Sequence, residues 1–160
     1  MKMKMTMAFC AVFVLIMGAC GGNNATTEEK SEAAPKSMVD DASSYDPNRG
    51  EGKFDASNVQ LGPVDATMAA AGKTIAETKC FSCHKTTDEK LVGPGWKGVT
   101  DRKTPHWIMN FITNPDPMID KDPEVQAQLE ICLVRMPNQN LQENEARSIV
   151  EFMRQNDGKK

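Results

Sequence analysis

Three residues near the middle of the chain, Cys80, Cys83 and His84, have types and a spacing that could do chemistry. Two cysteines separated by two residues are typical of a redox-active dithiol, of half a zinc site, or, when histidine follows directly, of covalent haem attachment. In the last case the two thiols bond to the haem vinyl groups, and the histidine is placed under the iron as an axial ligand. Histidine does follow here, so the motif permits all three chemistries.

The rest of the sequence favours haem attachment. Zinc would need two further Cys or His ligands with their own close spacing, whereas His106 and Cys132 stand alone. A thioredoxin-like dithiol would need a βαβ context, for which the sequence shows no pattern. We therefore predict one covalent haem c, attached through Cys80 and Cys83 and bound by His84.

Residues 1–19 have the pattern of an export signal. Lys2 and Lys4 precede a short apolar run that ends in small residues directly before Cys20. This run is too short to span a bilayer, which takes roughly 20 residues. The small residues before Cys20 resemble a bacterial lipoprotein signal, which predicts a lipidated Cys20 holding the protein on a membrane, facing the periplasm or the cell exterior. A cleaved signal with a soluble product is the alternative.

Residues 20–65 are predicted to form a disordered acidic tether. They hold few large apolar residues and no sustained periodicity, and they carry four basic and nine acidic groups. Residues 66–160 carry thirteen of each sign, so the acidity of the chain lies in the tether and the following domain is formally neutral. A neutral domain offers no charge patch from which to name a partner.

Residues 66–160 are predicted to form one all-α domain. Their apolar residues recur at helical spacing, and no β pattern competes. Four helices are predicted, over residues 66–79, within residues 101–115, from residue 122 and from residue 143. A domain of this size is only marginally stabilised by burial, so a central cofactor would help to hold it together.

Residues 66–160 resemble a class I cytochrome c domain. The resemblance rests on a helix, the motif from Cys80 to His84, the Gly-Pro-Gly turn centred on Pro94, and Met136 before a terminal helix. In that family a methionine before the last helix is the sixth iron ligand, which implies Met136 here. The resemblance also implies that the Pro94 carbonyl accepts a hydrogen bond from His84 and orients its ring.

Several residues keep two interpretations. Met118, expected in a loop, and His106 are the rivals of Met136 as the second axial ligand. Trp96 could line the haem or fill the core. Cys132 is expected to be a small buried residue. By the resemblance, Gly72 permits a close contact with the last helix.

Two axial ligands would leave no open iron position, so we expect a one-electron carrier rather than an enzyme. The expected partners are a membrane donor and a reductase or oxidase of a bacterial respiratory chain, with no nucleic acid and a monomeric carrier. A haem enzyme or gas sensor with an open axial site is the first alternative. A lipoprotein without haem, in which Cys80 and Cys83 form a disulfide, is the second.

Overall fold

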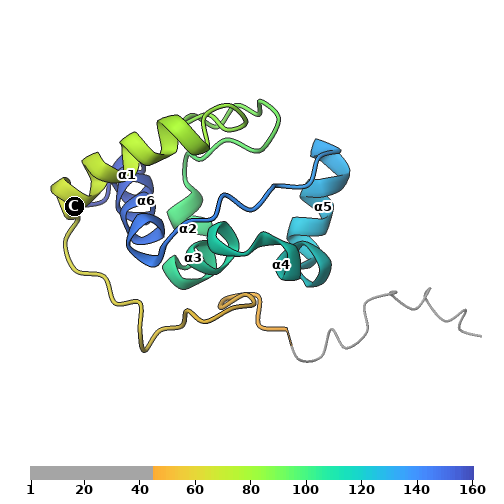
Figure 1. Cartoon of the computed structure of the whole chain (residues 1–160), viewed down its shortest axis with the longest axis horizontal. Helices are drawn as coiled ribbons and strands as arrows, with labels where there is room; N and C mark the ends of the chain where they lie inside the picture. Colours follow the sequence, from red (N-terminus) through yellow and green to blue (C-terminus); the bar gives the residue numbers. More distant parts are fainter. Residues whose placement is uncertain (1–44) are drawn as a thin grey trace, which may run out of the picture. The chain divides into compact units, whose positions relative to one another are not determined.

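The computed structural model describes residues 45–160, and this part of the chain is all-helical (Figure 1). Its elements are α1 (Ala66–Lys79), α2 (Val99–Arg102), α3 (Pro105–Thr113), α4 (Pro115–Lys121), α5 (Pro123–Cys132) and α6 (Glu143–Asn156). The predicted all-α fold is confirmed. The predicted signal peptide and the lipidated Cys20 lie outside the described residues.

The helices begin at the residues whose side chains can accept from free backbone N–H groups. Asp65 accepts from the backbone N–H of Met68 at 2.9 Å, which starts α1. Asp122 accepts from the first N–H groups of α5, at 2.8 and 3.2 Å. The backbone N–H of Gln142 donates to the Glu145 carboxylate at 2.7 Å, which closes the first turn of α6. These caps explain why the starts could be predicted from sequence.

Two further short helices, α2 and α4, form where loops were expected. Pro115 ends α3 and is also the first residue of α4, a position at which the missing N–H of proline costs nothing. Met118, expected in a loop, therefore lies on α4 with its side chain fully buried, at 0% exposed. It fills the space beside Gly50, where an added Cβ would come 2.5 Å from the Met118 methyl carbon.

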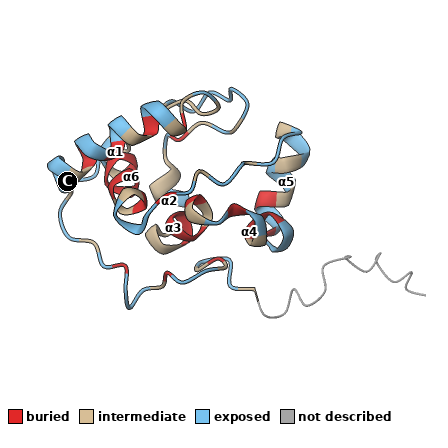
Figure 2. Cartoon of the chain, in the orientation of Figure 1, coloured by how far each residue is buried: buried red, intermediate tan, exposed pale blue. Residues whose placement is uncertain are grey.

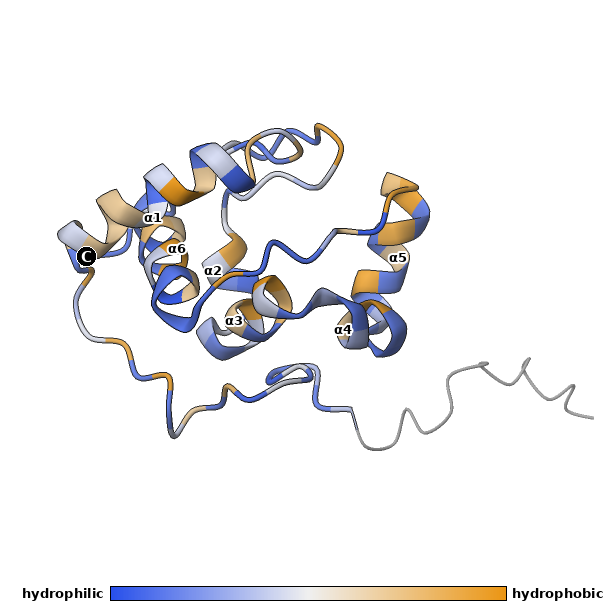
Figure 3. Cartoon of the chain, in the orientation of Figure 1, coloured by the Kyte–Doolittle hydropathy of each residue, from blue (hydrophilic) through white to orange (hydrophobic). Residues whose placement is uncertain are grey.

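The most extensive helix contact joins α1 to α6. At the contact, a Cβ added to Gly72 would lie 2.0 Å from the backbone oxygen of Ser148. The two helices can therefore approach so closely only because residue 72 lacks a side chain, as the resemblance implied. Buried faces of α6 and α3 turn toward each other across the core (Figure 2), and apolar residues gather there (Figure 3).

Residues 45–61, which we call the N-terminal strap, pack on the helical domain. The Phe54 side chain is 2% exposed, and its backbone N–H and carbonyl both bond to the side-chain amide of Asn110, each at 2.9 Å. The prediction of a disordered tether reaching residue 65 is therefore wrong for residues 45–65. A single deeply buried aromatic residue and a buried amide hold a stretch whose composition is otherwise that of a linker.

The strap also supplies one partner of a buried carboxylate. Asp122, 1% exposed, accepts from the Tyr45 hydroxyl at 2.5 Å and from Trp107 Nε1 at 3.0 Å. Two backbone N–H groups of α5 complete its set of donors. Because four donors surround it, the free-energy cost of burying the Asp122 carboxylate is small. Its hydrogen bonds link the strap, α3 and α5.

Tyr45 is the single tyrosine of the chain, so its ionisation can be followed alone. Burial, and then the hydrogen bond to Asp122, raise the pKa of Tyr45 above its ordinary value of about 10. A raised pKa stabilises the folded chain below pH ~10, and this contribution is lost as the pH rises through the folded-state value. An ultraviolet difference titration should show phenolate only well above pH 10, and Asp122→Asn should lower the midpoint. Ionisation of the folded protein near pH 10 would contradict the docked strap.

Candidate haem site

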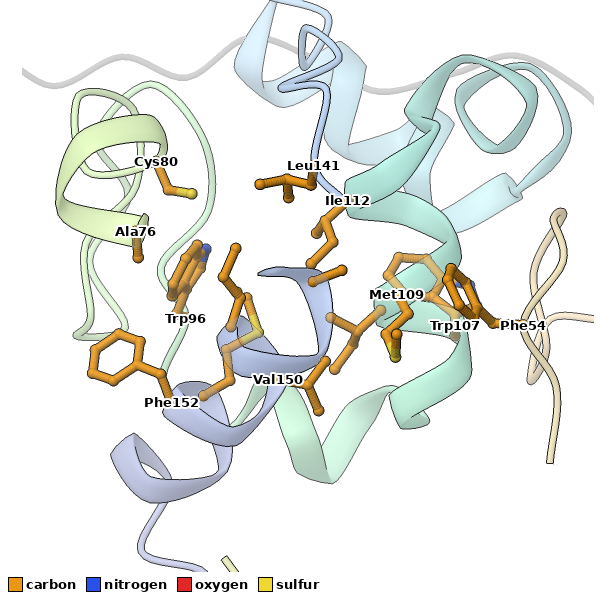
Figure 4. Close-up of a cluster of buried hydrophobic side chains, with 14 of the residues drawn as sticks. Phe54, Ala76, Cys80, Trp96, Trp107, Met109, Ile112, Leu141, Val150 and Phe152 are labelled. Carbon is orange, nitrogen blue, oxygen red and sulfur yellow. The ribbon is translucent and has the colours of Figure 1, made fainter. Parts of the chain in front are cut away.

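One cavity of about 460 Å³ lies between α1, α3, α5 and α6 and has a mainly apolar wall. Its size is within the range usual for cofactor sites. The structure brings every predicted site residue to this cavity, namely Cys80, Cys83, His84, Pro94, Trp96 and Met136. In Figure 4, Cys80 and Trp96 lie on one side, with Leu141 and Ile112 opposite them.

The turn that ends α1 positions the two thiols and the imidazole. The backbone N–H groups of Cys83 and His84 both donate to the Cys80 carbonyl, each at 3.0 Å. Cys80 is buried, and this burial raises the pKa of its thiol to about 11. Cys83 is only half-buried. All three cysteines among residues 45–160 are free thiols, so Cys80 and Cys83 form no disulfide in this structure.

The hydrogen bond of His84 determines which ring nitrogen can bind a metal. Nδ1 lies 2.8 Å from the Pro94 carbonyl oxygen, and a carbonyl can only accept, so Nδ1 carries the proton. Nε2 is then left with a free lone pair. Burial lowers the pKa of His84, against the smaller opposing effect of the Pro94 hydrogen bond, which favours the neutral ring that a metal ligand needs.

The backbone of the loop after His84 packs directly against the imidazole ring. The backbone N–H of Gly93 donates to the Cys83 carbonyl at 2.8 Å, and that of Trp96 donates to the Lys85 carbonyl at 2.9 Å. A Cβ added to Gly93 would lie 2.4 Å from His84 Cε1. Glycine is therefore required at residue 93 because the backbone passes directly against the imidazole.

Gly93→Ala should push the His84 ring away from Pro94 and lower the stability of the haem-loaded protein by about 1–3 kcal/mol, a cost usual for overpacking. The displaced ring should also change the electron paramagnetic resonance spectrum of the ferric protein. Gly62→Ala is the matched control, because an added Cβ there meets nothing within 4 Å. Equal spectra and equal stabilities for the two variants would show that the close approach at Gly93 is unimportant.

Trp96 both lines the cavity and fills the core. Its ring centroid lies 5.7 Å from that of His84 and 5.6 Å from that of Phe81. Phe152 of α6 packs on the same indole, with 6.4 Å between centroids. The two roles left open for Trp96 therefore coincide, and its indole limits how far the His84 ring can rotate.

Met136 lies in the segment between α5 and α6, where it is half-buried and packs on the core. Lys79 Nζ donates to the Gln139 carbonyl at 3.1 Å and so ties this segment to α1. Met118 and His106 are not among the residues that line the cavity. The geometry favours Met136 over both rivals, and its bond to iron stays a prediction.

The sequence reasoning missed the charged side chains of the cavity wall. They are Lys79, Arg102, Lys103, Glu124 and Arg135. A usable signal was the four-residue spacing of Lys103, which directly follows α2, and Trp107 in the first turn of α3. The Lys103 ammonium lies 4.4 Å from the indole centroid. Cys132, predicted as a small buried residue, is half-buried and also lines the cavity.

Residues 45–160 contain no group of three or more His, Cys, Asp or Glu side chains placed to hold a metal ion. The zinc alternative therefore lacks a ligand set in this part of the chain. Residues 69–157, more than half of the sequence, match the cytochrome c family. The chain belongs to the cytochrome c family. No curated protein sequence matches the chain.

Solved structures of cytochromes c resemble this one. Cytochrome c from Rhodothermus marinus is 34% identical, with a TM-score of 0.61, and the match covers 65% of this chain and 90% of that one. An engineered cytochrome c from the same organism is 33% identical, with a TM-score of 0.61, and the match again covers 65% of this chain and 90% of that one. A carbene-bound structure of this engineered protein has a TM-score of 0.58 at 33% identity.

A cytochrome c carries covalently bound haem, and the residues of this cavity fit that group. Cys80 and Cys83 are free thiols, and His84 has a free ring nitrogen because its other nitrogen donates to Pro94. The Met136 thioether and a mainly apolar wall complete the cavity. The cytochrome c therefore has the groups to attach one haem c and two candidate axial ligands to bind its iron.

Proposed function

We propose that this cytochrome c is a lipid-anchored one-electron carrier of a bacterial respiratory chain, working outside the cytoplasm between a membrane donor and a reductase or oxidase. The observation that carries the proposal is the presence of both His84 and Met136 at one cavity. Haem bound there supplies reversible one-electron chemistry at iron. If His84 and Met136 both held its iron, no position would be open for a substrate.

The surroundings of the two ligands favour electron transfer without rearrangement. His84 is fixed by its bond to Pro94 and by the Trp96 indole, and the Met136 segment is tied to α1 through Lys79. The cavity wall is mainly apolar. A thioether paired with histidine raises the reduction potential relative to two histidines. The chain thus supports a carrier with a rigid site.

Partners are proposed to dock at the apolar rim of the cavity. We define this rim as the exposed large apolar residues Leu91, Val92, Ile131, Leu133 and Val134. Val92 and Val134 line the cavity itself, and Lys90 Nζ donates to the Ile131 carbonyl at 2.7 Å, which joins the two segments. Because these five side chains carry no charge, their own contribution to docking should depend only weakly on salt.

The membrane anchor is proposed from residues outside the described part of the chain. Small residues before Cys20 support lipidation there. None of the helices among residues 45–160 is long and apolar enough to cross a bilayer. Acyl chains on Cys20 would hold the protein on a membrane surface.

A carbon monoxide titration of the ferrous full-length protein tests the carrier function. We expect no spectral change up to saturating gas, together with a reversible one-electron redox titration. Spectral change on adding carbon monoxide would instead indicate an open iron and favour the enzyme or sensor. Expression of Cys20→Ser tests the anchor in parallel, because this variant should move from the membrane fraction to the soluble fraction.

A further inference from the structure

The buried carboxylate of Asp122 lies behind one wall of the haem cavity. Trp107 lines that cavity, and its Nε1 donates to Asp122 Oδ2 at 3.0 Å. Ile119 and Val125, which precede and follow Asp122 in the chain, line the cavity as well. Asp122 itself is 1% exposed and is not one of the lining residues. The Trp107 side chain therefore contacts the cavity on one side and the carboxylate on the other.

The hydrogen bonds of Asp122 stabilise its ionised form. Oδ1 accepts from the backbone N–H groups of Glu124 and Val125, at 2.8 and 3.2 Å. Oδ2 accepts from the Tyr45 hydroxyl at 2.5 Å and from Trp107 Nε1. A carboxylate has about four lone-pair positions, and a carboxylic acid would have to donate from one of them. Since donors occupy all four, the group carries a negative charge.

Within residues 45–160, no cation forms an ion pair with this carboxylate. The Lys103 ammonium lies 4.4 Å from the centroid of the Trp107 indole, but it is paired with the Glu124 carboxylate at 2.8 Å. The four donors to Asp122 are neutral groups, which stabilise an anion without cancelling its charge. A buried charge is screened less than an exposed one, so its field extends into the cavity.

The N-terminal strap holds this carboxylate and the indole together. The Tyr45 hydroxyl, at one end of the strap, donates to Asp122. Further along, the strap backbone passes against the indole, since a Cβ added to Gly50 would lie 3.2 Å from Trp107 Cδ1. The strap, Asp122 and Trp107 therefore form one packed unit behind the cavity wall.

We propose that the Asp122 carboxylate lowers the reduction potential of the haem, and that the Tyr45 hydroxyl of the strap limits this effect. Oxidation adds one positive charge at the haem iron, so an anion behind the cavity wall stabilises ferric over ferrous iron. A short hydrogen bond to an ionised acceptor is strong and draws part of the negative charge toward the tyrosine. The strap thus acts as a positioning element of the redox site. The proposal rests on the haem alone and not on which residue is the second axial ligand.

The test measures the reduction potentials of haem-loaded full-length Asp122→Asn and Tyr45→Phe at neutral pH. Asparagine removes the charge and keeps an oxygen that can cap α5, so the equilibrium constant for accepting an electron from a mediator should rise about tenfold. Phenylalanine removes one donor and leaves the charge concentrated on Asp122, so the same constant should fall about threefold. A purely structural disturbance of the wall would not give opposite shifts in the two variants.

Two comparisons separate the charge of Asp122 from other effects. In the Asp122→Asn background, Tyr45→Phe should no longer lower the constant, because the charge that the hydroxyl moderates is gone. Glu77→Gln is the matched control, since it removes an exposed carboxylate of α1 that pairs with Lys73. We expect the potential of Glu77→Gln to equal that of the unsubstituted protein. The shift in Asp122→Asn should persist at high salt, because Asp122 is buried.

Tyr45→Phe keeps the test decisive if Asp122→Asn does not load haem, because it removes a single hydroxyl from a half-buried residue. A higher or unchanged potential in Tyr45→Phe would overturn the proposal, as would a lower or unchanged potential in Asp122→Asn. Failure of the unsubstituted protein to titrate reversibly with one electron would instead refute the carrier function.

Discussion

Met136→Ala should abolish the weak near-infrared sulfur-to-iron band of the ferric protein and lower its reduction potential. The band requires a thioether bonded to iron, and the Met136 side chain lines the same cavity as His84. Losing the thioether should also open one iron position. The ferrous variant should then bind carbon monoxide in a one-to-one ratio, whereas the unsubstituted protein binds none. Near-infrared absorption and gas titration measure both effects on one sample.

Met118→Leu is the matched control for this experiment. Met118 is fully buried on α4 against Gly50 and does not line the cavity, and leucine conserves most of its volume. We expect this variant to keep the band and to stay closed to carbon monoxide, with a stability loss below about 1.5 kcal/mol. Loss of the band in Met118→Leu, with its survival in Met136→Ala, would mean that the ligand assignment is wrong.

Gly72→Ala should destabilise the protein strongly although alanine is the better helix former. The added Cβ would lie 2.0 Å from the Ser148 backbone oxygen and 2.8 Å from the Ile149 backbone nitrogen. Because these are backbone atoms, α1 and α6 must move apart. We expect a net loss of about 1–3 kcal/mol of unfolding free energy, after a propensity gain of about 1 kcal/mol. Guanidinium unfolding of the haem-loaded protein measures the loss.

Ala71→Gly provides the reference for this loss. Ala71 is exposed on the same helix, so its replacement measures the alanine-to-glycine difference without a packing change. It should cost about 1 kcal/mol. If Gly72→Ala were as stable as the unsubstituted protein, the close α1–α6 contact would not be a constraint on this fold.

Local chemistry explains what could be predicted from the sequence. Asp65 and Asp122 accept from backbone N–H groups in the first turns of α1 and α5, so short segments of sequence determine where those helices begin. The relation of Cys80, Cys83 and His84 is likewise set within one turn. These features depend on residues that are neighbours in the chain.

The features that were missed depend on residues far apart in the chain. Phe54 is buried because Asn110 bonds to its backbone, and no local pattern of the strap signals that partner. Glu124 and Lys103 form their ion pair at the cavity wall, between α5 and the residue that follows α2. From its composition alone the strap resembles a linker, because two or three buried side chains hardly change the mean hydropathy of the segment.

The most direct test of the account is the pyridine haemochrome spectrum of the purified full-length protein, recorded together with a haem stain on a denaturing gel. We predict one haem per chain that stays attached after denaturation, with the spectrum of a haem joined through two thioether bonds, because Cys80 and Cys83 are both free and both at the cavity. A protein exported with its native maturation machinery that shows no stain, whether Cys80 and Cys83 are free thiols or joined in a disulfide, would contradict it.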